Sequence, residues 1–90
     1  MPRRTDANQK ELVKAIRKLG ASVQDLSQVG KGCPDILVGY KGVNYLFEIK
    51  NPDMPPSKRR LTPDEMKFFE DWKGEMTIVK TIDDILGILI

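Results

Sequence analysis

The sequence predicts an α/β fold in which helices flank one mixed β-sheet, in the order α-β-β-β-α-β-α. Apolar runs of strand length surround a Lys41-Gly42 turn, and segments with helix caps and helical apolar spacing stand on both sides of them. The composition agrees, because 40% hydrophobic and 31% charged residues are typical of a globular chain. A chain of 90 residues has room for one small core, so we expect a single domain spanning residues 1–90.

The first helix is expected at residues 7–19. Asp6 is its N-cap, Gln9 holds the reciprocal position of a capping box, and Gly20 ends the helix. The residues predicted to form its buried stripe, spaced by four and three, are Leu12, Ile16 and Leu19. The basic residues expected on its solvent side are Lys10, Lys14, Arg17 and Lys18.

A weak alternation at 21–26 predicts a short strand ahead of a hairpin at 33–50. If the hairpin loop is the two residues Lys41-Gly42, the numbers of paired residues add up to 83, and Asp35 lies opposite Glu48. A four-residue loop would raise this sum to 85 but keep both carboxylates on one face of the sheet. A bulge or a three-residue loop would separate them.

The second half of the chain begins with a proline-rich basic segment at 51–60, which we expect to be a loop. Thr62 and Glu65 then form a capping box, with proline at the first helical position. This box accounts for Glu65, which we interpret as a capping carboxylate rather than a site residue. The residues expected on the apolar face of this helix are Phe69 and Trp72. A strand at 76–80 and a short apolar helix after the Thr81 cap complete the order.

The residue counts exclude several kinds of function. No histidine is present, which removes serine–histidine triads, cysteine–histidine pairs and histidine-ligated zinc. The single cysteine, Cys33, cannot form an intramolecular disulfide. No apolar run approaches the roughly 20 residues of a membrane span, and no apolar signal sequence follows the start, so we expect no membrane partner and a cytoplasmic location.

The hairpin carries the residues that point to chemistry. Like charges facing each other on a sheet destabilise it by up to about 1 kcal/mol, so the pair Asp35 and Glu48 calls for an explanation. A divalent cation supplies one, because two carboxylates, the backbone carbonyl of Ile49 and water form the oxygen-rich shell of Mg²⁺ or Mn²⁺. Lys50, on the face of Glu48, could act on water or on a phosphate. This set suits metal-assisted hydrolysis of a phosphodiester.

Pro34-Asp35, followed after twelve residues by Glu48-Ile49-Lys50, matches the PD-(D/E)xK nuclease pattern. Further stretches make the likeness more specific: 6–9, 20–23, 29–32, 61–63 and Trp72. Together they resemble a stand-alone VRR-NUC (virus-type replication-repair nuclease) domain, bacterial or phage-encoded, over nearly the whole chain.

The resemblance implies a restriction-endonuclease-like core, dependence on Mg²⁺ or Mn²⁺, and a homodimer that cleaves structured or branched DNA, such as Holliday junctions or flaps, in replication or repair. Asp35, Glu48 and Lys50 take the family's catalytic roles. Glu11 matches an acidic residue of the first helix that completes the metal shell through water or a second ion. These domains often have glutamine at the position of Glu65, so the role of that glutamine does not carry over.

Other interpretations remain open at this stage. Four basic residues near the motif are candidates for phosphate contacts, although a solvated run would look the same: Lys31, Lys58, Arg59 and Arg60. A non-catalytic DNA-binding module of the same fold would keep these residues without needing the acid pair. A small interaction protein would instead work through its apolar end at 85–90, where we also place the dimer contact.

Overall fold

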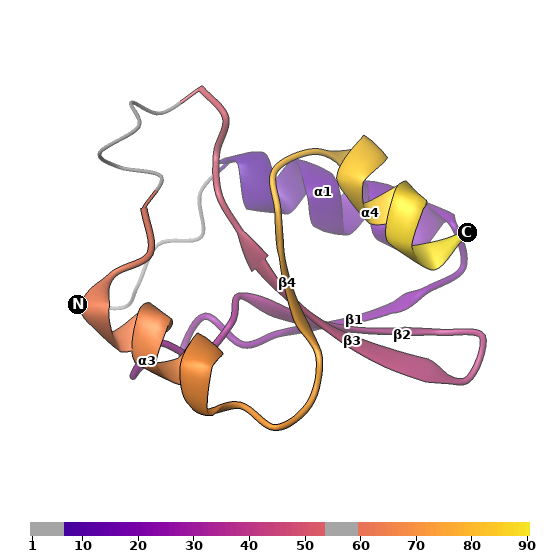
Figure 1. Cartoon of the computed structure of the whole chain (residues 1–90). Helices are drawn as coiled ribbons and strands as arrows, with labels where there is room; N and C mark the ends of the chain where they lie inside the picture. The colour runs from indigo at the N-terminus through magenta and orange to yellow at the C-terminus, as the bar shows by residue number, and fades with distance from the viewer. Residues whose placement is uncertain (1–6, 54–59) are drawn as a thin grey trace.

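The computed structural model describes residues 7–53 and 60–90, which form a four-stranded sheet with flanking helices (Figure 1). The elements in chain order are α1 (Ala7–Lys18), β1 (Ser22–Asp25), β2 (Ile36–Tyr40), β3 (Val43–Ile49), α3 (Pro63–Asp71), β4 (Met76–Val79) and α4 (Ile82–Leu89). The strands lie in the order β1-β2-β3-β4, with β4 parallel to β3 and the other pairs antiparallel. The predicted mixed sheet and element order are confirmed.

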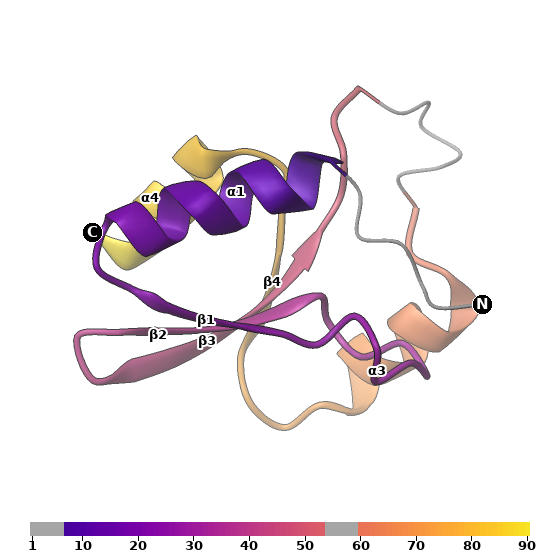
Figure 2. The same cartoon turned by 180° about the vertical axis from the view of Figure 1, so that it is seen from behind.

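Helices α1 and α4 lie side by side on one face of the sheet, and α3 lies beyond the other face (Figures 1 and 2). The core fills the space between the sheet and helices α1 and α4, and α3 contributes no side chain to it. Its buried apolar residues are Leu12, Ile16, Ala21, Ile36, Val38, Phe47, Ile49, Val79, Ile85 and Leu89. Within 7–53 and 60–90, no helix is long and apolar enough to cross a membrane.

The hairpin between β2 and β3 has the two-residue loop that positions the acid pair. Tyr40 pairs with Val43, and the register continues without a bulge to Ile36 opposite Phe47. Lys41 and Gly42 both have positive φ angles, of 50° and 82°, as the tight turns that suit a twisted hairpin require. The predicted register, with paired numbers adding up to 83, is therefore confirmed.

Two details of the predicted helices are wrong. Helix α1 ends at Lys18, and Gly20 then turns the chain with a φ of 91°, so Leu19 lies past the helix and is 37% exposed. Helix α3 buries a carboxylate, Glu65, while Phe69 and Trp72 are about half exposed. The side of this helix that carries Glu65 faces the protein, because Glu65 forms a nearly buried ion pair with Lys50. The Asp6 cap falls outside the described residues.

The C-terminal helix is more buried than we expected. Ile85 and Leu89 are enclosed in the core of this chain, and only the last residue, Ile90, is largely exposed among its aliphatic residues, at 82%. Thr81 caps the helix as predicted, with a hydrogen bond from the Asp84 N–H to its hydroxyl. The helix therefore lacks the wide apolar face that we proposed for a dimer contact.

Candidate active site

Two buried carboxylates meet where β2 begins and β3 ends. Side chains alternate along a strand, so Ile36 and Phe47 point into the core, and Asp35 and Glu48, one step further along each strand, share the opposite face. Asp35 is 7% exposed and Glu48 is 2% exposed. The sequence predicted that they face each other; the structure adds that both are out of bulk water.

Asp35 is held in place by the backbone on both sides. Its N–H donates to the Phe47 carbonyl at 3.1 Å, and its own carbonyl accepts from the Leu26 N–H at 2.8 Å. Its carboxylate oxygen Oδ2 accepts from the backbone N–H of Ile49 at 2.7 Å. The side chain is thus fixed beside the strand that carries Glu48.

Glu48 is in a costly position for a charged group. Its Oε1 is buried and has no hydrogen-bond partner among the described residues, and its Oε2 lies 3.6 Å from the ammonium of Lys50. Burial raises the pKa of Glu48 to about 9, helped by a hydrogen bond with Asp35 and by the charges of Asp35 and Glu65, and opposed by Lys50. In the metal-free protein Glu48 therefore holds a proton at neutral pH.

Lys50 is bound more tightly to a third carboxylate. Its Nζ lies 2.9 Å from Oε1 of Glu65, and both side chains are nearly buried. Burial lowers the pKa of Lys50, but the hydrogen bond to Glu65 and the neighbouring carboxylates outweigh it and raise the pKa overall. Burial raises the pKa of Glu65, but Lys50 and the Thr62 N–H lower it by more. The pKa of Glu65 therefore lies below its usual value. Both groups are charged at neutral pH.

Glu65 has two functions at once, of which sequence reasoning found one. The same Oε1 accepts from the backbone N–H of Thr62 at 2.8 Å, and the Thr62 hydroxyl accepts from the Glu65 N–H at 3.2 Å, which is the predicted capping box. The ion pair with Lys50 was missed. No local pattern could reveal it, because it depends on how α3 docks beside β3.

A glycine makes this docking possible. Gly32 has a φ of 78°, and a Cβ at this position would overlap the backbone carbonyl of Asp64 in the first turn of α3. The loop that leads through Pro34 to Asp35 therefore lies directly against the N-terminus of the helix. This contact brings Glu65 to the carboxylates on the neighbouring strands.

Within 7–53 and 60–90, no ion pair joins the other predicted site residues to this cluster, and two of those residues fall outside these ranges. Glu11 is exposed on α1, and no hydrogen bond or ion pair within 7–53 and 60–90 joins it to the acid pair. Lys31 is exposed and lines a hollow beside α3 with Asp64 and Trp72. Arg60 is exposed just before the Thr62 cap. Lys58 and Arg59 fall outside the described residues.

The donor set fits a hard divalent cation. Mg²⁺ is usually bound through one or two carboxylates and keeps several waters, and Asp35 and Glu48 supply such a pair, with one oxygen of Glu48 left free of hydrogen bonds. Ile49 stands between Glu48 and Lys50, where its carbonyl could add a neutral oxygen ligand. No cluster of three or more His, Cys, Asp or Glu side chains in the described part of the chain could hold an ion alone, so water would have to complete the shell.

The comparison with solved structures agrees with this geometry. No family model matches the sequence, and no curated protein matches it. A solved structure described as a VRR_NUC domain superposes with a TM-score of 0.58 and 26% sequence identity, over 89% of this chain and 87% of that chain.

The mixed sheet with its flanking helices is a nuclease-like α/β fold. More specifically, the chain has the fold of a VRR-NUC domain over nearly its whole length, which confirms the resemblance indicated by its motifs. The match supports a nuclease-family domain, a class of fold that generally uses divalent metals.

Proposed function

We propose that this chain is a divalent-metal-dependent DNA endonuclease that hydrolyses phosphodiester bonds in structured or branched DNA. The observation that carries the proposal is the buried pair Asp35 and Glu48, with one Glu48 oxygen lacking a hydrogen-bond partner among the described residues and Lys50 alongside. Two carboxylates buried together weaken a small domain unless they serve a ligand. The likeness to a VRR_NUC domain supports nucleic acid as the substrate.

Asp35, Glu48 and the carbonyl of Ile49 would hold Mg²⁺ or Mn²⁺, with Glu11 contributing through water. When bound, the ion supplies positive charge for a phosphate oxygen and a more acidic water. Lys50 would place its ammonium on the attacking water or on the phosphate, and Glu65 would hold that ammonium in position through the 2.9 Å contact. The arrangement favours hydrolysis over simple binding, because a binding module has no use for a buried acid pair.

The residues that would hold the DNA are the basic residues predicted from the sequence: Lys31, Lys58, Arg59 and Arg60. We further propose a homodimer, since two copies of a site in fixed relation would cut paired strands of a junction symmetrically. The exposed apolar residues of α3 offer one surface for it: Met66, Phe69 and Trp72, each between 44% and 49% exposed.

The test is a panel of labelled DNA substrates: plain duplex, flap, splayed-arm and four-way junction. The wild-type protein should cleave at least one branched substrate with Mg²⁺ or Mn²⁺ and none with EDTA. Glu48→Gln, which keeps the shape of the side chain, is the matched inactive control. Binding to DNA without cleavage of any substrate, with either metal, would favour a non-catalytic DNA-binding module instead.

A further inference from the structure

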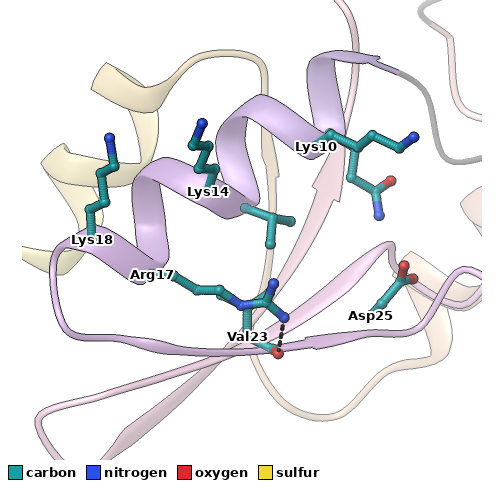
Figure 3. Close-up of a pocket in the computed structure, with 8 residues that line it drawn as sticks. Lys10, Lys14, Arg17, Lys18, Val23 and Asp25 are labelled. Atoms are coloured by element: carbon teal, nitrogen blue, oxygen red, sulfur yellow. Dashed lines mark hydrogen bonds between the residues drawn. The ribbon is translucent and has the colours of Figure 1, made fainter.

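A second feature of the molecule lies away from the acid pair, on the side of the sheet covered by α1. A groove of about 540 Å³ runs between α1 and the edge strand β1 (Figure 3). The residues labelled along it in Figure 3 are Lys10, Lys14, Arg17, Lys18, Val23 and Asp25. Lys10 and Asp25 lie toward one end and Lys18 toward the other.

The four basic residues form one row because of their spacing. At about 100° per residue, positions 10, 14, 17 and 18 fall within about 100° of the helix circumference, nearly opposite the stripe that buries Leu12 and Ile16. The row therefore borders the groove on the outer side of α1, and the ammonium groups of Lys14 and Lys18 point away from β1 (Figure 3). With a rise of about 1.5 Å per residue the row is about 12 Å long. Since phosphates follow each other at about 3.4 Å of axial rise along one DNA strand, the row covers three or four of them.

The charge of the groove is concentrated and not neutralised. Four basic and one acidic lining residue give it a formal charge of +3, which exceeds the +2 of the whole chain and leaves the remainder slightly negative. Within 7–53 and 60–90, ion pairs join Lys50 to its two carboxylates and Lys67 to Asp71, but none involves the row on α1. Glu11, the acidic residue of α1, lies beside this row by helix period, but no ion pair joins it to the row within the described residues, whereas Lys67 and Asp71 pair at 3.0 Å.

The groove also has a defined floor and a fixed cation. Val13 and Val23 pack against the core and line it. Arg17 crosses to the edge strand and donates to the Val23 carbonyl at 3.2 Å, so its guanidinium is held over the groove (Figure 3). No aromatic ring lines the groove, which leaves nothing on which an unpaired base could stack. The lining suits the sugar-phosphate backbone rather than bases.

The position of the groove relates it to the acid pair. Strand β1 ends at Asp25, whose side chain lines the groove, and the next residue, Leu26, donates its N–H to the Asp35 carbonyl at 2.8 Å. One end of the groove thus lies at the end of the sheet that carries the candidate catalytic carboxylates. A polyanion bound along α1 would extend toward the end of the sheet where Asp35 lies.

We propose that the basic row on α1, together with the groove that it borders, binds the phosphate backbone of duplex DNA on one side of the cleaved bond, without reading its sequence. The proposal rests on the proposed nuclease function for the identity of the polyanion. It adds to the contacts proposed for Lys58, Arg59 and Arg60, and it predicts contacts spread along one helix rather than at the scissile phosphate.

The test compares two charge-matched double variants of the full chain, with EDTA present so that nothing is cleaved. Lys14→Gln with Lys18→Gln removes two charges from the row, and Lys41→Gln with Lys73→Gln removes two from the hairpin turn and from the loop after α3. All four side chains belong to exposed residues, and circular dichroism verifies that both variants fold. Fluorescence anisotropy with duplexes of two unrelated sequences gives Kd and its salt dependence.

The groove variant should bind both duplexes about tenfold or more weakly near 0.1 M salt, and its log-log salt slope should fall by about two. The control variant should stay within about twofold of wild type. Equal losses in both variants, or a loss for only one of the two duplex sequences, would overturn the assignment.

Cleavage separates this proposal from the function itself. With Mg²⁺, the groove variant should lose kcat/KM but keep kcat at saturating DNA. If the wild type cleaves while the groove variant binds as tightly as wild type, the groove assignment is wrong and the nuclease stands. If no DNA is cleaved by wild type but the groove variant still loses affinity, the nuclease proposal is wrong and the groove remains a DNA-binding surface.

Discussion

Replacing Glu48 with Gln should make the metal-free protein more stable at neutral pH, although the substitution touches the candidate catalytic centre. Glu48 is 2% exposed and shares its face with Asp35. Its pKa is raised from 4.5 to about 9, chiefly by burial and then by Asp35. Glutamine keeps the shape of the side chain without a charge. Lys50 keeps its nearer partner Glu65, at 2.9 Å, so no buried ammonium is left unpaired.

The direction of the pH dependence follows from the raised pKa. Between pH 4.5 and about 9 the folded chain retains a proton on Glu48 that the unfolded chain has released. The contribution of Glu48 to the free energy of unfolding is therefore highest below pH 4.5 and falls as the pH rises toward 9. Each pH unit corresponds to about 1.4 kcal/mol, which amounts to about 3 kcal/mol between pH 4.5 and pH 7.

Water at the rim of the site screens part of this cost. We expect the variant to gain about 1 to 2 kcal/mol at pH 7, or roughly 5 to 10 °C in Tm for a domain of this size. Urea unfolding of both proteins in EDTA, from pH 5 to pH 8, measures the difference. Glu75→Gln, which changes an exposed glutamate before β4, is the matched control and should follow wild type. A wild type with level stability over this range, or a Glu48→Gln protein less stable than wild type at pH 7, would refute the reasoning.

The remaining predictions concern activity and assembly. Asp35→Asn or Glu48→Gln should reduce cleavage by at least about a hundredfold with the fold retained, and near-normal turnover in either variant would contradict the site assignment. Lys50→Ala should lose activity but keep more of its Mn²⁺ affinity than Glu48→Gln does, as isothermal titration can show, because the lysine is not a ligand. Glu65→Gln can still cap α3 and should destabilise the fold by about 1 kcal/mol less than Glu65→Ala, yet both should lower kcat if the carboxylate positions Lys50. Light scattering during size-exclusion chromatography should give twice the chain mass, and a monomer at micromolar concentration would exclude the homodimer.

Sequence reasoning found the acid pair because its position follows from local rules. A two-residue turn at Lys41-Gly42 fixes which residues face each other, and the alternation of side chains then puts Asp35 and Glu48 on one face. The third carboxylate depends on tertiary docking: Glu65 reaches Lys50 because Gly32 lets a loop approach the first turn of α3. A capping box explains a glutamate so completely that the sequence offers no reason to seek a second role for it.

The exposed side of α3 was misjudged for a related physical reason. Apolar residues at helical spacing predict a face turned toward the core, and the spacing of Phe69 and Trp72 does favour a helix here. The cap end of this helix is anchored instead by the ion pair at Glu65, so the polar side turns inward and the apolar side stays about half exposed. Apolar spacing predicts that this segment is helical, but the ion pair of Glu65 with Lys50 determines which side of the helix faces the protein.

If the nuclease proposal holds, the buried carboxylates link protonation, metal affinity and stability in one site. Glu48 must release its proton before its carboxylate can serve as a ligand, so affinity for Mn²⁺ should increase as the pH rises toward the raised pKa of about 9. Lys50 compensates Glu48 only in part, because its ammonium lies 2.9 Å from Glu65 but 3.6 Å from Glu48. Once Glu48 has released its proton, the charge that offsets its repulsion with Asp35 must therefore come mainly from outside the chain, and any ion that provides it also stabilises the fold. Metal-dependent stabilisation that grows with pH and disappears in Glu48→Gln would distinguish this coupling from a general salt effect, which would shift the wild type and the variant alike.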